Sequence, residues 1–222
     1  MDTPYDRFIL VTGGARSGKS TFAERLAAQL AEPLGGRVTY LATSETNDAE
    51  IAARVAAHRA ARPAAWTTVE CPLEAPVAVR QHAAAPVLLL DCVTFWVTNL
   101  LFRGGALGGS TPPDEGFNYV KDLLPAGEER AASARVSAGV ADLLAALAET
   151  GATMVAVSNE VGLGVVPEYP LARLYRDQLG WANQRLAAAA DRVYFLVAGF
   201  PLDVTALAAS PLTQPPVKES DQ

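Results

Sequence analysis

The chain has 222 residues, half of them apolar, and this length is sufficient for one domain with a sizeable core. Its formal net charge of −6 disfavours nucleic acid as the main partner, because a phosphate backbone binds basic surfaces. The polar, acidic start at 1–6 is not expected to be a secretory signal, and the most apolar stretch, 86–102, is interrupted by polar residues, which makes it a poor membrane span.

Apolar, strand-like runs alternate along the chain with segments of helical periodicity. This alternation predicts an α/β fold, a mostly parallel sheet flanked by helices on both faces. Residues 1–207 are expected to form one domain, and 208–222, rich in Pro, Ser and charge, a disordered tail. The expected strands are 8–12, 37–42, 66–70, 86–91, 152–157 and 192–197, and the expected helices lie near 19–31, 47–60, 93–102, 131–149 and 169–190.

The first predicted strand leads into a glycine-rich loop with the phosphate-binding pattern G-x-x-x-x-G-K-[ST], in the strand–loop–helix context that this motif requires. Successive backbone N–H groups and the helix N-terminus bind phosphate in such loops. Lys19 is expected to reach the β- and γ-phosphates, and the Ser20 hydroxyl to ligate Mg²⁺. The sequence therefore predicts a site for a nucleoside triphosphate. Its residues are Gly13, Gly14, Ala15, Arg16, Ser17, Gly18, Lys19 and Ser20.

Polar side chains follow the second and third predicted strands. Thr43, Ser44 and Glu45 come directly after the second strand, and Glu70 ends the third. The carboxyl ends of parallel strands line one crevice, so these side chains are candidates to bind a base, a ribose or a second substrate. Capping of the helix expected near 47–60 explains the first three equally well, and for Glu70 a role in structure is just as acceptable.

His58 lies on a predicted helix with arginines around it. Arg54 shares its helical face, and Arg59 and Arg62 follow before Pro63 ends the helix. Nearby positive charge favours the neutral imidazole, whose ring nitrogen can attack phosphorus, while arginines can hold displaced phosphates. The residues alone leave three roles open for His58: a nucleophile, a phosphate ligand or a solvated surface histidine.

Asp91 ends the apolar run 87–91 at the predicted carboxyl edge of a strand. In phosphate-loop folds a carboxylate at this place holds Mg²⁺ directly or through water. The alternative is an ordinary helix N-cap. Because the phosphate-binding motif precedes it in the same chain, we favour the metal role, so the predicted metal ligands are Ser20 and Asp91.

Ser158, Asn159 and Glu160 follow the predicted strand 152–157 at the same edge. Such a polar triplet can sense a γ-phosphate or position an acceptor hydroxyl, and a capped turn is the alternative.

Other features predict structure rather than chemistry. The Gly- and Pro-rich segment 103–127 is expected to be an insertion, either a flexible loop or a lid. Cys71 and Cys92 have no metal-ligand or redox spacing and are expected to be buried thiols in a reducing cytoplasm. His82 has no charged cluster around it and is expected at the surface.

The chain resembles the bifunctional adenosylcobinamide kinase / adenosylcobinamide-phosphate guanylyltransferases of cobalamin biosynthesis. The resemblance covers roughly 8–102 and 130–204, and the combination of its motifs in this order is highly specific, whereas the glycine loop alone is common. The matching blocks are 11–20, 40–44, 53–55 with His58 and Arg62-Pro63, 90–94 with 98–101, 159–167 and 183–187.

The resemblance implies two reactions in a RecA-like phosphate-loop domain that is commonly assembled as a trimer. A nucleoside triphosphate, ATP or GTP, first phosphorylates the aminopropanol hydroxyl of adenosylcobinamide. GTP then transfers GMP to that phosphate through a guanylyl-histidine, which falls on His58, and pyrophosphate is released. The implied guanine-nucleotide contacts are the glycine loop and Thr43, Ser44, Glu45, Arg59, Ala60, Ala61, Arg62, Glu70 and Asp91.

Two features depart from the family pattern. The segment 103–127 is longer than in compact relatives, and Trp181 stands where relatives tend to have a polar or basic residue. The second departure leaves the cobinamide contacts open. Two other functions remain to be weighed: a monofunctional small-molecule kinase in which His58 only binds phosphate, and a nucleotide-binding regulatory protein without turnover.

Overall fold

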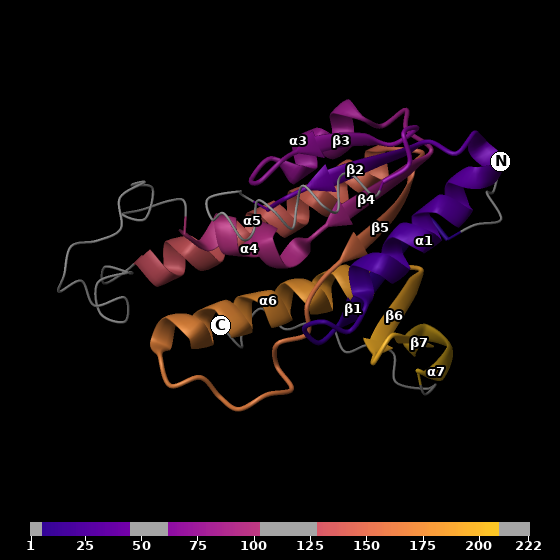
Figure 1. Ribbon diagram of the computed structural model, residues 1–222. Coiled ribbons are helices and arrows are strands. Elements are labelled where there is room, and N and C mark those ends of the chain that lie inside the picture. Colours follow the sequence, from indigo (N-terminus) through magenta and orange to yellow (C-terminus); the bar gives the residue numbers. More distant parts are fainter. Residues whose placement is uncertain (1–5, 45–61, 103–127, 209–222) are drawn as a thin grey trace.

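A computed structural model describes residues 6–44, 62–102 and 128–208 of the chain. Strands and helices alternate in it, as the sequence predicts (Figure 1). In chain order the elements are β1 (Phe8–Gly13), α1 (Lys19–Ala31), the 3₁₀ turn η1 (Glu32–Leu34), β2 (Val38–Ala42), β3 (Thr67–Glu70), α3 (Ala75–Gln81), β4 (Val87–Asp91), α4 (Val93–Phe102), α5 (Glu128–Glu149), β5 (Thr153–Val157), α6 (Pro170–Ala189), β6 (Arg192–Val197), β7 (Phe200–Asp203) and α7 (Val204–Leu207).

The strands form one sheet in the order β3-β2-β4-β5-β1-β6-β7. Neighbouring strands are parallel except β6 and β7, which pair antiparallel. Strand β5 therefore separates β1, which leads into the glycine loop, from β4, which ends at Asp91. The predicted α/β class, a mostly parallel sheet flanked by helices, is confirmed.

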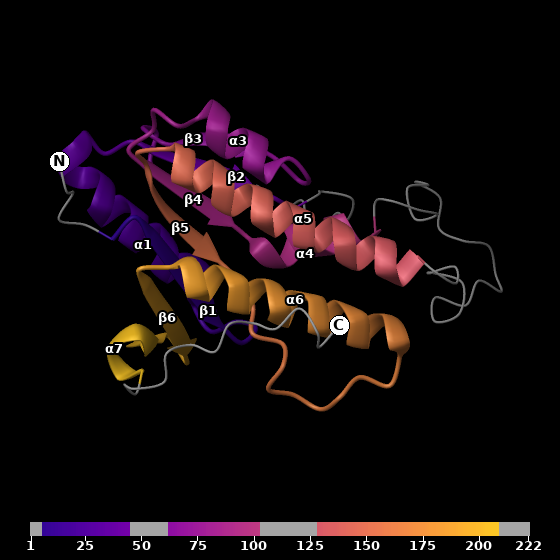
Figure 2. The ribbon, with the colours of Figure 1, turned by 180° about the vertical axis from the view of Figure 1, so that it is seen from behind.

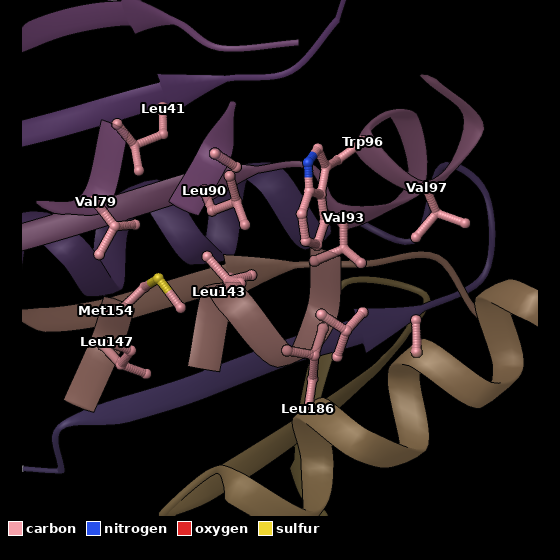
Figure 3. Close-up of a cluster of buried hydrophobic side chains, with 14 of the residues drawn as sticks. Leu41, Val79, Leu90, Val93, Trp96, Val97, Leu143, Leu147, Met154 and Leu186 are labelled. Atoms are coloured by element: carbon pink, nitrogen blue, oxygen red, sulfur yellow. The ribbon is translucent and has the colours of Figure 1, made fainter. Parts of the chain in front are cut away.

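Helices cover both faces of the sheet. Helix α1 lies in front of the sheet in Figure 1. The view from behind in Figure 2 shows α5 and α6 in front of the sheet. Helix α1 approaches closely because it buries alanines, Ala23, Ala27 and Ala31, against the strands. The opposite face carries the larger side chains, with Trp96, Leu143 and other residues of α3, α4, α5 and α6 packed on the strands (Figure 3).

Helix α5 is long and apolar enough to cross a membrane by length and composition alone. Its apolar stripe is buried in the core instead, packed against α3, α4 and α6. We therefore interpret it as a core helix. The stripe consists of Ala132, Val136, Val140, Leu143, Ala146 and Leu147.

Four elements in the described part of the chain were not predicted from the sequence: η1, α3, β7 and α7. The expected helix near 47–60, the insertion 103–127 and the tail beyond residue 208 lie outside the described residues. The two cysteines are buried and free, as expected. His82 is half-buried at the end of α3, where its backbone N–H donates to Ala78, so it is less exposed than the surface position that the sequence predicts.

Candidate functional site

The glycine loop connects β1 to α1 through a series of unusual backbone conformations. Gly13, Arg16 and Gly18 have positive φ values of 149°, 55° and 90°. Such angles suit glycine, and they turn successive N–H groups toward the inside of the loop. Within the loop Ser17 N–H donates to Gly14 O over 3.3 Å, and Phe22 N–H donates to Gly18 O over 3.0 Å, which starts α1.

Segments that come much later in the chain hold this loop in place. The N–H of Glu160, after β5, donates to Gly13 O over 3.0 Å, and the N–H of Gly199, between β6 and β7, donates to Ser17 O over 2.9 Å. The backbone also passes close to Gly13, where a Cβ atom would lie 2.5 Å from Leu196 O. Glycine at this position is therefore required by packing as well as by φ.

Lys19 begins α1 and is buried, with 8% of its surface exposed. Its Nζ donates to Gly14 O over 2.6 Å, so the ammonium group is curled back onto the loop. Burial lowers the pKa of Lys19, and the charges of Cys92 and Asp91 partly oppose that shift. The protein only partly balances the positive charge of this desolvated ammonium. The phosphate oxygens of a triphosphate bound in the loop would balance it more fully.

Two hydroxyl groups beside the loop are buried without a hydrogen-bond partner among the described residues: Ser17 Oγ and Thr12 Oγ1. Buried polar groups are normally paired, and an unpaired one in a binding loop is a group that a ligand can satisfy. The loop therefore has the glycine geometry, the lysine and the unpaired donors that fit a bound phosphate group.

Asp91 lies at the carboxyl end of β4 and is half-buried. The hydroxyl of Tyr40, on the neighbouring strand β2, donates to Asp91 Oδ2 over 2.7 Å. Beside it, the Thr43 hydroxyl accepts from Cys92 N over 2.8 Å and donates to Cys92 O over 2.7 Å. Thr43 is completely buried, so its side chain fixes the end of β4 rather than facing the crevice.

Arg62 lies across β2, with its guanidinium carbon 3.3 Å from the centre of the Tyr40 ring. The guanidinium also donates to Thr68 Oγ1 over 3.1 Å and lies 4.0 Å from Glu24 Oε1 on α1. Only 7% of the Arg62 side chain is exposed. Most of its surface is therefore in contact with protein.

The structure brings one group of the predicted site residues to a single edge of the sheet. The loop 13–20, the half-buried Ser44 and the exposed Glu70 lie at the carboxyl ends of β1, β2 and β3, and Asp91 at that of β4. Five predicted site residues lie outside the described residues: Glu45, His58, Arg59, Ala60 and Ala61.

A second polar cluster was not predicted as a unit. Asn183, on α6, accepts from Ser158 Oγ over 2.5 Å and donates to Asn159 O over 2.9 Å. Asn159 N–H donates to Thr94 Oγ1 on α4 over 2.8 Å. These contacts hold Ser158 and Asn159, in the polar triplet 158–160 that follows β5, in position against α4 and α6. Asn183 and Asn159 both lie in matching family blocks, which is the only sequence signal that connects them.

The donor set at the sheet edge fits Mg²⁺. Ser20, in the first turn of α1, supplies a hydroxyl, and Asp91 supplies one carboxylate near Lys19. Across the described parts of the chain, no group of three or more His, Cys, Asp or Glu side chains could hold a metal ion. One or two oxygen ligands from the protein suit Mg²⁺, which keeps several waters and binds substrate phosphates.

Comparison with known proteins gives a family match over residues 9–204, to the model described as cobinamide kinase / cobinamide phosphate guanyltransferase. The chain is 44% identical to a bifunctional adenosylcobalamin biosynthesis protein of Salmonella typhimurium, over 88% of this chain and 98% of that protein. It is 42% identical to the protein of the same description from Pseudomonas aeruginosa, over 87% of this chain and 94% of that one.

Among solved structures, a KaiC-like protein from Pyrococcus horikoshii superposes with a TM-score of 0.43 at 16% identity, covering 85% of this chain and 70% of the other. The flagellar accessory protein FlaH from Methanocaldococcus jannaschii also gives a TM-score of 0.43, at 12% identity, over 88% of this chain and 74% of the other.

Proposed function

Because the chain belongs to the cobinamide kinase / cobinamide phosphate guanyltransferase family, we propose that it carries out both reactions of cobalamin biosynthesis that this description names. It phosphorylates adenosylcobinamide with a nucleoside triphosphate and then converts adenosylcobinamide phosphate to adenosylcobinamide-GDP with GTP. The observation that carries the proposal is that the family match spans residues 9–204 and so includes the phosphate loop, His58 and Asp91.

In the kinase reaction the loop residues 13–20 bind the triphosphate through backbone N–H groups. Lys19 moves its Nζ from Gly14 O to the β- and γ-phosphates, where it stabilises the charge that develops during transfer. The substrate hydroxyl attacks the γ-phosphorus, the bond between that phosphorus and its bridging oxygen breaks, and the nucleoside diphosphate leaves. The contact of Nζ with Gly14 O supports this role, because it places the ammonium group against the loop.

In the guanylyl transfer a ring nitrogen of His58 attacks the α-phosphorus of GTP. The bond from this phosphorus to the bridging oxygen breaks, and pyrophosphate leaves. A phosphate oxygen of adenosylcobinamide phosphate then attacks the same phosphorus, and the phosphorus–nitrogen bond breaks to return the histidine. Arg59 is proposed to neutralise the departing pyrophosphate. The family's histidine pattern, His-x-x-x-Arg-Pro, supports this assignment, with His58, Arg62 and Pro63 in place.

Mg²⁺ is proposed to be held by Ser20 and Asp91. When bound, it would screen the charge of the phosphate oxygens. The nucleotide contacts proposed beyond the loop are Ser44, Glu45 and Glu70, with the backbone around Ala60 and Ala61. Thr43 and Arg62 are proposed to act mainly by holding β2 and β4 in position, since both side chains are buried.

The experiment that tests the two reactions uses GTP labelled at one phosphorus. GTP labelled at the α-phosphate is expected to leave an adduct on the protein that is labile to acid and stable to alkali, as a phosphoramidate is. A label at the γ-phosphate should leave none. The same measurement on His58→Ala should give no adduct, while His82→Ala, which removes the other histidine of the chain, should label like the wild type.

Two results would contradict this assignment. If the α-label never attaches, or attaches equally to His58→Ala, the guanylyl-histidine does not form, and the monofunctional kinase becomes the better description. If neither label is turned over in the presence of adenosylcobinamide, the chain is a nucleotide-binding protein without catalysis. ATP and GTP compared as γ-phosphoryl donors in the first reaction would identify the preferred donor.

We further propose that the protein is a homotrimer in the cytoplasm, as the family resemblance implies. Exposed apolar side chains after β5 and around β7 support self-association, since large exposed apolar surface commonly marks an interface. Light scattering in solution would measure the mass, for which a trimer requires about three times 23.3 kDa. These side chains include Leu163, Val165, Val166, Phe200 and Leu207.

A further inference from the structure

We propose that Tyr40 is a positioning residue for Asp91: it holds one carboxylate oxygen on the β2 side and leaves the other for the metal site. The inference rests on the proposed role of Asp91 as a ligand of Mg²⁺, and it adds a residue that does not touch substrate or metal. It begins from the pairing of two strands, since β2 and β4 are neighbours and Ala42 pairs with Asp91.

The contact itself is short and buried. Tyr40 lies two residues before the end of β2, and its side chain points to the same face of the sheet as Asp91. The phenol reaches along the strands to the sheet edge and donates to Asp91 Oδ2 over 2.7 Å. Tyr40 is only 4% exposed, so water does not compete freely for this hydrogen bond.

The phenol is a permanent donor. A phenol is protonated at physiological pH, so the Tyr40 hydroxyl has a proton to donate to Asp91 Oδ2. The carboxylate therefore receives its hydrogen bond from an uncharged group. An arginine or lysine at this position would neutralise Asp91, whereas a phenol leaves its charge available to a cation.

The ring of Tyr40 is fixed from the other side. The guanidinium of Arg62 stacks 3.3 Å from the ring centre and is itself tied to Thr68 over 3.1 Å. A buried cation against an aromatic face is stabilising and leaves the ring little freedom to rotate away. Arg62 thus fixes the orientation of the Tyr40 ring, and Tyr40 fixes the orientation of the Asp91 carboxylate.

The hydrogen bond from Tyr40 affects how the Asp91 carboxylate is oriented relative to the Lys19 ammonium. The two groups carry opposite charges and lie at the same edge of the sheet. Without the hydrogen bond from Tyr40 the carboxylate would be free to turn toward the ammonium, and an ion pair between them would occupy both groups. With Oδ2 held by Tyr40, Oδ1 accepts no hydrogen bond from the described residues and remains available to a metal ion or its water.

Tyr40→Phe tests the inference, because it removes only the hydroxyl and keeps the ring beneath Arg62. Mn²⁺ replaces Mg²⁺ as the probe, and the loss of its free electron paramagnetic resonance signal measures binding in the presence of a non-hydrolysable GTP analogue. Removing a partner that orients a metal ligand typically weakens metal affinity 10–100-fold, and we expect a loss of about that size. Affinity for the same analogue in EDTA should stay within about twofold of the wild type, since the loop is unchanged.

Tyr194→Phe is the matched control. Tyr194 lies on β6, packs on the same face of the sheet and contacts Phe22 of α1, but has no contact with Asp91. It should bind Mn²⁺ like the wild type. If Tyr40→Phe also binds like the wild type, or if it weakens metal-free binding of the analogue as much as it weakens Mn²⁺ binding, the positioning role is wrong.

Asp91→Asn distinguishes failure of this inference from failure of the proposed metal site. Loss of Mn²⁺ binding in Asp91→Asn together with normal binding in Tyr40→Phe would refute only the positioning role of Tyr40. Normal Mn²⁺ binding in Asp91→Asn would show that Asp91 is not a metal ligand. The positioning role of Tyr40 would then be refuted as well.

Discussion

Lys19 shows most directly how a side chain in this loop is placed for chemistry rather than for stability. It is buried, its ammonium donates to the carbonyl of Gly14, and burial lowers its pKa below the ordinary 10.5. A lowered lysine pKa means that the folded protein disfavours the charged form relative to the unfolded chain. The fold therefore accepts a destabilising charge at the place where a triphosphate would bind.

This argument predicts opposite effects of Lys19→Met on stability and on activity. Methionine has a similar length and no charge, so we expect the free energy of unfolding at neutral pH to rise by about 1 kcal/mol. Kinase turnover should fall by roughly 10²–10³-fold, since one donor to the transferred phosphoryl group is lost. Urea denaturation and a steady-state kinase assay measure the two effects, and a variant with normal turnover would disprove the assigned role of the loop lysine.

The difference in stability between Lys19→Met and the wild type is expected to depend on pH. Below the lowered pKa of folded Lys19 both states are protonated and the folded state carries the full penalty of the buried charge. Between that pKa and 10.5 the unfolded chain binds more protons than the folded one, so the stability of the wild type rises with pH. The advantage of Lys19→Met should therefore shrink as the pH approaches 10.5, and a constant difference would contradict the linkage.

The strand–loop–helix structure around residues 13–20 was predicted well because its motif is local: a strand, a glycine-rich loop and a helix follow one another within one stretch of chain. The sequence did not predict the contact of Tyr40 with Asp91 or the stacking of Arg62 on Tyr40. Those contacts depend on which strand neighbours which, and on a side chain crossing a strand. Arg62 was expected to hold phosphates, but its surroundings are an aromatic ring and a threonine.

At the level of elements, α6 is tied to the end of β5 by one buried amide. Asn183 satisfies both the Ser158 hydroxyl and the Asn159 carbonyl, and Asn159 is in turn bound to Thr94 of α4. Because the Glu160 N–H also binds Gly13 O, the turn after β5 connects α6 and α4 to the phosphate loop. A helix on one face of the sheet thus supports a loop that leads to the helix on the other.

Asn183→Ala is predicted to break this connection. It leaves the completely buried Ser158 hydroxyl without its acceptor and the Asn159 carbonyl without its donor, which should cost about 1–3 kcal/mol. Guanidinium chloride denaturation measures the loss. Gln184→Ala, on the exposed side of the same helix, is the matched control and should change stability by no more than about 0.5 kcal/mol. Equal effects in the two variants would show that the buried amide contributes nothing particular.

The strands with continuous apolar runs, such as β1 and β4, were predicted nearly to their ends, because a strand buried on both faces needs apolar residues at every position. Strand β7 was not, because Phe200–Asp203 contains a proline and pairs antiparallel only at the edge of the sheet. Helix α3 was missed because its seven residues are too few to show helical periodicity. Both elements depend on tertiary contacts.

At the scale of the whole molecule, the described residues form two hydrophobic cores, one on each face of the sheet, with one cysteine in each. Cys71 belongs to the core beneath α3, α4, α5 and α6, and Cys92 to the core beneath α1. Burial raises the pKa of each thiol to about 12. Since the thiolate is the reactive form, both should be inert in the native protein at neutral pH.

The two thiols therefore report on the unfolding of the two faces. We predict that Ellman's reagent modifies neither cysteine in the native protein and both in denaturant. Cys71→Ala and Cys92→Ala leave one reporter each, and both should become reactive over the same range of urea concentration, because the two cores share every strand of the sheet's centre. Separate transitions would show that the faces unfold independently.

The position of β1 inside the sheet, between β5 and β6, has a consequence for folding during synthesis on the ribosome. Val11 pairs with Val157 on one side and with Tyr194 on the other, so β1 leaves the ribosome long before either of its neighbours, β5 and β6. At roughly 5–20 residues per second, that wait lasts on the order of ten seconds or more. The carbonyls of Gly13 and Ser17 likewise await the N–H groups of Glu160 and Gly199. A nascent chain that displays the whole nucleotide motif therefore still lacks two of the backbone hydrogen bonds that hold the phosphate loop in the folded protein.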